Sequence, residues 1–155
     1  YNFEKLSGYK FSENIVYKLV ENFPDQIIGV KDSSYNLFEK LKIDNFSLMP
    51  GSESKLLKGL DLGCSGIITA TTNATASLAR DVYENFINKN EQNLNEKLCE
   101  VRAVFEQYNL ISGLHTFFAQ NDANYENILP PLRILNENEK NNLLNQLYTL
   151  DFKNN

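Results

Sequence analysis

Short apolar runs alternate with helix-like segments along the first ninety residues of the chain. The runs cover residues 27–30, 46–49 and 66–70, and turn-forming residues such as Pro24 and Pro50 bound them. None of the runs alternates strictly between apolar and polar positions, which is typical of strands buried on both faces of a parallel sheet. We therefore expect three buried parallel strands.

Segments with helical spacing of apolar residues precede, separate and follow these runs. Ser12, Ser34 and Ser52 are suited to begin three of them as N-caps, and Gly63 is a stop signal for the third. The predicted order alternates helices and strands, for which parallel strands with crossover helices are the natural arrangement. The apolar positions of the four segments are Ile15, Val16, Leu19 and Val20; Leu37, Phe38 and Leu41; Leu56, Leu57 and Leu60; and Leu78, Val82 and Phe86.

From residue 91 onward the pattern predicts helices alone. One apolar stripe is formed by residues of the segment 94–105, and Pro130-Pro131 breaks the chain before the last helix. That helix starts with the Asn136-x-x-Glu139 pattern of a capping box. We therefore divide the chain into an α/β part over residues 1–90 and a helical extension over residues 91–155.

The three predicted strands make a poor independent sheet. Their open edges would expose unpaired backbone groups, which invite association, and three strands cannot close a barrel. The chain begins with Tyr1, and its one methionine is Met49. We therefore expect it to be a fragment of a longer protein.

The composition is that of a folded globular protein, with 155 residues, 42% apolar, 23% charged and a net charge of -5. The acidic balance argues against a nucleic-acid partner, which calls for a basic face. No apolar run is long enough to cross a membrane. Cys64 and Cys99 form no CxxC pair, so we expect a reducing, cytoplasmic location.

Lys31 is the first residue whose position suggests chemistry. It follows the apolar run 27–30 and precedes Asp32, and the carboxyl end of a parallel strand is where α/β barrels place catalytic groups. Desolvation in an apolar interior disfavours a charged amine, and the neutral form is a nucleophile toward carbonyl carbon. The alternative is a lysine that only marks the exit of the strand to solvent.

Other candidates carry less information by themselves. Tyr1 offers a phenol for proton transfer. The loop with Gly51, Glu53 and Ser54, and the backbone around Ile68, place small residues and amides at strand ends. Such loops suit polar ligands, but each alone is equally an ordinary turn.

Taken together, these motifs resemble the dihydrodipicolinate synthase / N-acetylneuraminate lyase family of class I pyruvate aldolases. They occur in the order and with the spacing of the family over nearly the whole chain, and the ending Pro130-Pro131-Leu132-Arg133 before a helix is also similar. The motifs are Tyr1-Asn2 with Leu6-Ser7-Gly8; Ile28-Gly29-Val30-Lys31-Asp32-Ser33-Ser34; Gly51-Ser52-Glu53; and Gly66-Ile67-Ile68-Thr69-Ala70-Thr71-Thr72-Asn73.

The resemblance implies the C-terminal half of a (β/α)8 TIM barrel, with strands six to eight followed by C-terminal helices and usually assembled as a homotetramer. Tyr1 would end strand five, and Lys31 would end strand six. It also implies that Lys31 forms a Schiff base with a 2-keto acid and that Tyr1 relays a proton. Gly51, Glu53 and Ser54 would face the distal part of the substrate, and the backbone around Ile68 would lie beside the keto acid.

Two positions depart from the family pattern. Glu4 stands where the family usually has proline, which concerns a local turn. Leu6 stands where the synthase members carry an arginine that holds the carboxylate of their aldehyde substrate. The main hypothesis is therefore a lyase that cleaves a 2-keto-3-deoxy sugar acid, or a similar 4-hydroxy-2-keto acid, to pyruvate and an aldehyde.

Two alternatives stay open: a 4-hydroxy-tetrahydrodipicolinate synthase that condenses pyruvate with aspartate semialdehyde, and a non-catalytic keto-acid-binding relative. We expect the fragment alone to be inactive. His115 is the only histidine, so we expect no metal site and no cofactor. Its apolar neighbours Leu114, Phe117 and Phe118 suggest a packing role at a C-terminal helix.

Overall fold

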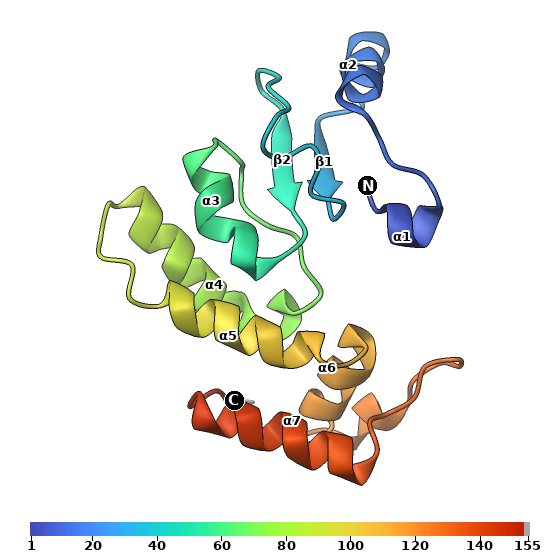
Figure 1. The fold of residues 1–155 in the computed structure, drawn as a ribbon, viewed down its shortest axis with the longest axis vertical. Helices are drawn as coiled ribbons and strands as arrows, with labels where there is room; N and C mark the ends of the chain where they lie inside the picture. Colours follow the sequence, from blue (N-terminus) through green and yellow to red (C-terminus); the bar gives the residue numbers. More distant parts are fainter. Residues whose placement is uncertain (154–155) are drawn as a thin grey trace. The chain divides into compact units, whose positions relative to one another are not determined.

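The computed structural model describes residues 1–153 and forms two compact units. The first contains residues 1–69 and 83–90, and the second contains residues 70–82 and the described residues from 91 onward. The elements are α1 (Glu4–Ser7), α2 (Glu13–Asn22), β1 (Gly29–Asp32), β2 (Ser47–Pro50), η1 (Glu53–Lys55), α3 (Leu56–Asp61), α4 (Thr72–Ile87), α5 (Asn95–Glu106), α6 (Leu110–Phe118), η2 (Ala123–Glu126) and α7 (Glu137–Thr149) (Figure 1).

The two strands of the first unit lie side by side and point the same way (Figure 1). Their parallel register pairs Gly29 with Ser47 and Lys31 with Met49. A Cβ at Gly29 would lie 2.5 Å from the carbonyl oxygen of Ser47, so the close approach of the strands at this point requires glycine. Burial alternates along β1, with Val30 buried and Lys31 only half-buried, so Lys31 lies on the opposite side of the strand from the core.

Two further extended segments flank this pair. Asn2 forms a parallel bridge with Asp32 beside β1. On the other side, the Ser65 amide donates to the carbonyl of Leu48 at 3.0 Å, and the Ile68 amide donates to the carbonyl of Pro50 at 3.2 Å. Four chain segments therefore run next to one another, in the order in which they follow along the sequence.

The prediction of a third regular strand over residues 66–70 is wrong. The stretch lies beside β2, but the pairing is uneven. The bonding amides belong to Ser65 and Ile68, which are three residues apart, whereas the carbonyls that accept them belong to Leu48 and Pro50, which are two residues apart. The extra residue breaks the regular ladder, as at a bulge. Gly66 sits there with a φ of 145°, a conformation that glycine adopts without strain.

The predicted helix that begins at Ser34 does not form either. Residues 33–40 are bends and turns, and Tyr35 takes a left-handed φ of 56°. The buried Asp32 carboxylate accepts the amides of Leu37 and Phe38 at 2.9 and 3.0 Å, which folds the chain back on the strand end. Leu37 and Phe38 are nevertheless buried, as their apolar pattern predicts.

Two other predicted helices are present. Ser12 caps α2 by accepting the amide of Ile15 at 3.4 Å. The helix expected after Ser52 starts with the 3₁₀ turn η1 and continues as α3, and the Ser52 hydroxyl lies 3.1 Å from the Ser54 hydroxyl with no cap bond. The core of the first unit unites these elements; its buried members are Val16, Val30, Leu37, Phe38, Leu41, Leu48 and Cys64.

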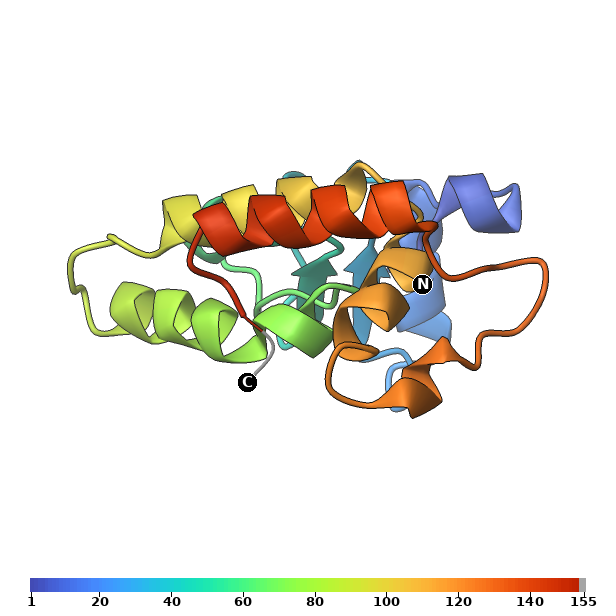
Figure 2. The same ribbon diagram turned by 90° about the horizontal axis from the view of Figure 1, so that it is seen from below.

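The second unit packs α5, α6 and α7 against one another, and Figure 2 shows α5 and α7 running along each other. The predicted capping box of α7 is present: Asn136 accepts the Glu139 amide at 3.0 Å, and Glu139 accepts the Asn136 amide at 2.9 Å. The rings of Phe105 and Phe117 meet edge to face, 5.6 Å apart, at the centre of the core. Among the described residues, no helix is both long and apolar enough to cross a membrane.

Candidate active site

The carboxyl end of β1 brings Lys31 and Tyr1 together. The Lys31 ammonium lies 4.3 Å from the centre of the Tyr1 ring, a distance at which the ring attracts a cation. The Tyr1 hydroxyl donates a hydrogen bond to the Ser33 hydroxyl at 3.3 Å. Lys31 and Ser33 are two residues apart on an extended chain, so both side chains lie on the same side as the phenol.

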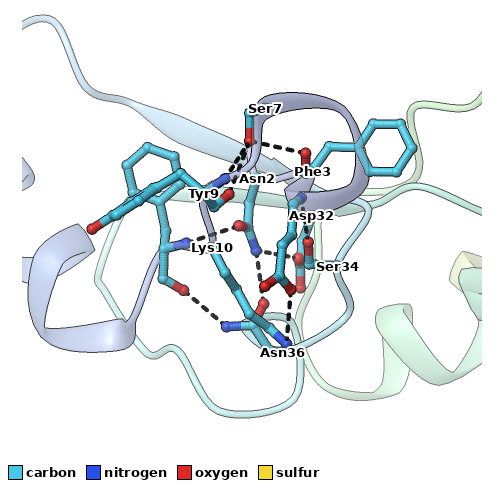
Figure 3. A network of polar contacts seen from close by, with 10 residues as sticks. Asn2, Phe3, Ser7, Tyr9, Lys10, Asp32, Ser34 and Asn36 are labelled. Atoms are coloured by element: carbon cyan, nitrogen blue, oxygen red, sulfur yellow. Dashed lines mark hydrogen bonds and ion pairs between the residues drawn. The ribbon is translucent and has the colours of Figure 1, made fainter.

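Tyr1 is held there by the backbone and side chain of its neighbour Asn2. The Asn2 amide donates to the carbonyl of Lys31 at 2.9 Å, and the Asn2 carbonyl accepts the amide of Ser33 at 2.9 Å. Its side chain is fully buried and points to the opposite side of the sheet edge from Tyr1. Figure 3 shows this side chain at the centre of a polar network.

Asp32 is the anionic member of the network. One carboxylate oxygen accepts the side-chain amide of Asn2 at 2.7 Å, and the other accepts two backbone amides of the turn after β1. The carboxylate is fully buried. Hydrogen bonds to its charged form offset the cost of this burial, so the network braces the strand end that carries Lys31.

Gly51 approaches the same place from β2. Its amide donates to the carbonyl of Asp32 at 3.0 Å. A Cβ at Gly51 would lie 2.1 Å from the Ser33 hydroxyl oxygen, so the Ser33 hydroxyl can face Tyr1 only because residue 51 has no side chain. Gly51 thus belongs to the same constellation as Tyr1, Lys31 and Ser33.

The remaining predicted residues lie at neighbouring strand ends. Glu53 is fully buried in η1, and its carboxylate accepts the Thr69 hydroxyl at 2.7 Å. This bond ties the end of β2 to the segment that carries Ile68, whose side chain is 42% exposed. Ser54 is exposed next to Ser52. A direct contact thus connects Tyr1 with Lys31, and Glu53, Ser54 and Ile68 lie at the neighbouring strand ends.

Sequence reasoning named no role for Ser33, Asp32, Asn2 or Thr69. Ser33 could have been found from strand periodicity, because it lies two residues after Lys31 and therefore on the same side. Asp32 offered a signal as well, since a carboxylate that directly follows an apolar run at the start of a turn often accepts backbone amides. The partners of Asn2 and Thr69 are distant in sequence, and no local pattern indicates them.

The chemistry available at this edge is that of an amine, a phenol and hydroxyl groups. An amine can attack a carbonyl carbon, and a phenol beside it can transfer protons. Within residues 1–153, no group of three or more His, Cys, Asp or Glu side chains is placed to hold a metal ion.

A family sequence model, described as the dihydrodipicolinate synthetase family, matches residues 1–150. The chain belongs to the dihydrodipicolinate synthetase family. The 4-hydroxy-tetrahydrodipicolinate synthase of Archaeoglobus fulgidus is 29% identical over 111 residues, which are 68% of this chain and 38% of that protein. An uncharacterised DapA-like lyase of Halobacterium salinarum is 26% identical over 123 residues, which are 75% of this chain and 40% of that protein.

Solved structures of the dihydrodipicolinate synthase family share the fold. The enzyme of Cyanidioschyzon merolae with bound lysine has a TM-score of 0.85 at 16% identity, covering 98% of this chain and 54% of that one. Escherichia coli YagE in complex with pyruvate has a TM-score of 0.78 at 20% identity, covering 98% of this chain and 55% of that one. These relatives are TIM barrels, and the chain spans about half their length.

Proposed function

We propose that the chain is part of a pyruvate-dependent class I aldolase in which Lys31 forms the Schiff base and Tyr1 relays protons. The observation that carries the proposal is the Lys31 ammonium 4.3 Å from the Tyr1 ring at the end of a parallel strand. Membership in the dihydrodipicolinate synthetase family supports it. A protein that only bound a keto acid would need neither the amine nor the phenol.

The position in the barrel is part of the proposal. The chain covers about half of the matched structures, which supports a C-terminal half: Tyr1 ending strand five, β1 as strand six and β2 as strand seven, with the irregular segment 66–70 in the place where strand eight would run. Residues 1–90 would belong to the barrel and residues 91–155 to a helical extension. The complete protein would be a cytoplasmic homotetramer, and this half alone would be inactive.

The reaction follows from the two side chains. The neutral Lys31 amine attacks the keto carbon of the substrate, and loss of water leaves an iminium. Tyr1 accepts the proton of the 4-hydroxyl and passes its own proton on to solvent or the substrate carboxylate. The electrons of the bond between C3 and C4 move into the iminium, so an aldehyde leaves and an enamine remains. Protonation of the enamine at C3 and hydrolysis of the imine release pyruvate and restore the amine.

Leu6 favours cleavage of a hydroxylated substrate. Its side chain is 77% exposed at the end of α1, where it offers no charge to an anionic aldehyde. Loss of a charge-assisted contact to a carboxylate costs very roughly 1.5–3 kcal/mol of binding free energy. We therefore propose a 2-keto-3-deoxy sugar acid, or a similar 4-hydroxy-2-keto acid, as the substrate, with Gly51, Glu53, Ser54 and the Ile68 backbone around it.

The second candidate is a 4-hydroxy-tetrahydrodipicolinate synthase, because the Archaeoglobus fulgidus relative carries that name. The two candidates share the imine and differ in the aldehyde. The deciding measurement is kcat/KM of the full-length protein for cleavage of 2-keto-3-deoxygluconate and for condensation of pyruvate with aspartate semialdehyde. We expect cleavage to be preferred. A preference for the semialdehyde would assign the synthase reaction. It would also mean that a cationic residue elsewhere binds the carboxylate in place of the arginine that Leu6 replaces.

The covalent step has its own test. Borohydride added to the full-length protein with pyruvate should reduce an imine onto Lys31, identified by peptide mass spectrometry. Lys31→Ala should abolish both labelling and turnover. Tyr1→Phe should keep the imine but lower kcat by roughly 10²-fold. Labelling at another lysine, or turnover by Lys31→Ala, would refute the assignment.

A further inference from the structure

The polar network of Figure 3 surrounds the buried Asn2 side chain. The Asn2 side chain donates to Asp32 at 2.7 Å and to the Asn36 side-chain oxygen at 2.8 Å, and its own oxygen accepts the amide of Phe11 at 3.0 Å. Asn36 in turn donates to the carbonyl of Phe11 at 2.9 Å. Both N–H groups of the Asn2 side chain therefore have an acceptor, and its oxygen has a donor.

The identities of the partners fix the orientation of the Asn2 amide. Asp32 presents only acceptors when it is ionised, so the nitrogen of Asn2 must face it. A flip of the amide would turn two oxygens toward each other at Asp32 and two N–H groups toward each other at Phe11. The buried carboxylate thus selects one conformation of Asn2 and disfavours the alternatives through the cost of unpaired buried groups.

The orientation of the Asn2 side chain determines the side of the chain on which Tyr1 projects. Adjacent residues of an extended chain project to opposite sides, so anchoring Asn2 on the buried side directs the phenol to the side of Lys31. Tyr1 itself is 58% exposed, and it contacts the Lys31 ammonium, the Ser33 hydroxyl and the ring of Phe3. A ring that is more than half exposed depends on its backbone anchor for its position.

We propose that Asp32 and Asn2 are a positioning pair that sets the Tyr1 phenol in register with the Lys31 amine. The inference rests on the proposed function for its catalytic meaning, because positioning matters only if the phenol transfers a proton near the amine. Asp32 lies on the opposite side of the strand from Lys31, and its carboxylate accepts hydrogen bonds from Asn2 and from two backbone amides of the following turn. Its effect on catalysis therefore passes through Asn2 and Tyr1.

Asp32→Asn is the principal variant, because it keeps the size of the side chain and turns one acceptor into a donor. A displaced reacting group lowers kcat by roughly 10²-fold, so we expect a loss of that order in the full-length protein. In a Tyr1→Phe background the same change should cost less than about threefold, because the group that it positions is already absent. Losses that multiply in the double variant would overturn the inference.

A structural readout separates this inference from the proposed function. The Tyr1 ring should shift the Lys31 side-chain protons upfield in the NMR spectrum, since the ammonium lies above its face. Asp32→Asn should remove this shift. Asn36→Ala is a milder change that serves if Asp32→Asn does not fold, and it should reduce the shift. Leu41→Ala is the matched control, because it truncates the core of the same unit without touching the network and should lower stability while the shift stays.

The outcomes discriminate between the two ideas. An unchanged Lys31 shift in Asp32→Asn overturns the positioning pair, whatever the enzyme does. A lost shift in a protein that forms no borohydride-trappable imine with pyruvate supports the positioning pair and refutes the proposed function. An equal loss of shift in Leu41→Ala would show general loosening of the unit, and it would overturn the inference as well.

Discussion

Gly51 offers a sharp test of how the strand ends are assembled. A methyl group at this position would lie 2.1 Å from the Ser33 hydroxyl oxygen, 3.0 Å from its Cβ and 3.2 Å from its Cα. The first distance is far inside van der Waals contact, so Gly51→Ala forces the hydroxyl to rotate. The two longer distances require a further shift of the strand ends by a few tenths of an ångström.

The magnitude follows from these contacts. Overpacking of a close contact costs about 1–3 kcal/mol of unfolding free energy. Rotation of Ser33 also breaks its bond with the Tyr1 hydroxyl, worth about 0.5–1.5 kcal/mol at most for an exposed pair. In a Ser33→Ala background the 2.1 Å contact no longer exists, so Gly51→Ala should then cost less by about 1 kcal/mol or more.

The assay is a double-mutant cycle in urea. Unfolding free energies are measured for the parent chain, Gly51→Ala, Ser33→Ala and the double variant, with the dependence on urea checked for a constant slope. We expect Gly51→Ala to be clearly less destabilising when Ser33 is already alanine. An equal cost in both backgrounds would refute the reasoning, because it would show that the hydroxyl of Ser33 does not occupy the space beside Gly51.

Three further predictions concern Glu139, Cys64 and the metal requirement of the full-length protein. The Arg133 guanidinium and the Asn136 amide lower the pKa of the Glu139 carboxyl below its usual value. The charged carboxylate therefore stabilises the fold. This stabilisation is present above the usual pKa of about 4.3 and is lost as the pH falls through the lowered pKa. Acid unfolding curves of Glu139→Gln should lack this pH-dependent loss of stability. Burial raises the pKa of the Cys64 thiol, so its reaction with a thiol reagent should be slow in the folded chain and rapid in urea. Turnover by the full-length protein should survive exhaustive chelation, and a loss of activity that zinc or magnesium restores would show that the aldolase class is wrong.

Sequence patterns predicted the helices best where local signals agree. The capping box of α7 and the Ser12 cap of α2 each depend on residues three positions apart, so the chain needs no distant partner to form them. The apolar runs also indicated β1 and β2 correctly. Local reasoning failed at residues 34–41, where Asp32 takes the amides that a helix would have used, and at residues 66–70, where one extra residue interrupts the ladder beside β2.

For the site, the place of Lys31 after an apolar run made it a candidate, and the family resemblance predicted roles for both Lys31 and Tyr1. Local patterns could not determine that these two side chains meet, because residues 1 and 31 are distant in sequence and the backbone bonds of Asn2 to the end of β1 bring them together. Nor could they assign Ser33 to Tyr1 or Thr69 to Glu53. Local sequence patterns reflect the secondary structure that neighbouring residues favour. Contacts between strand ends depend instead on strand register, which is decided when the buried faces of separate segments pack together.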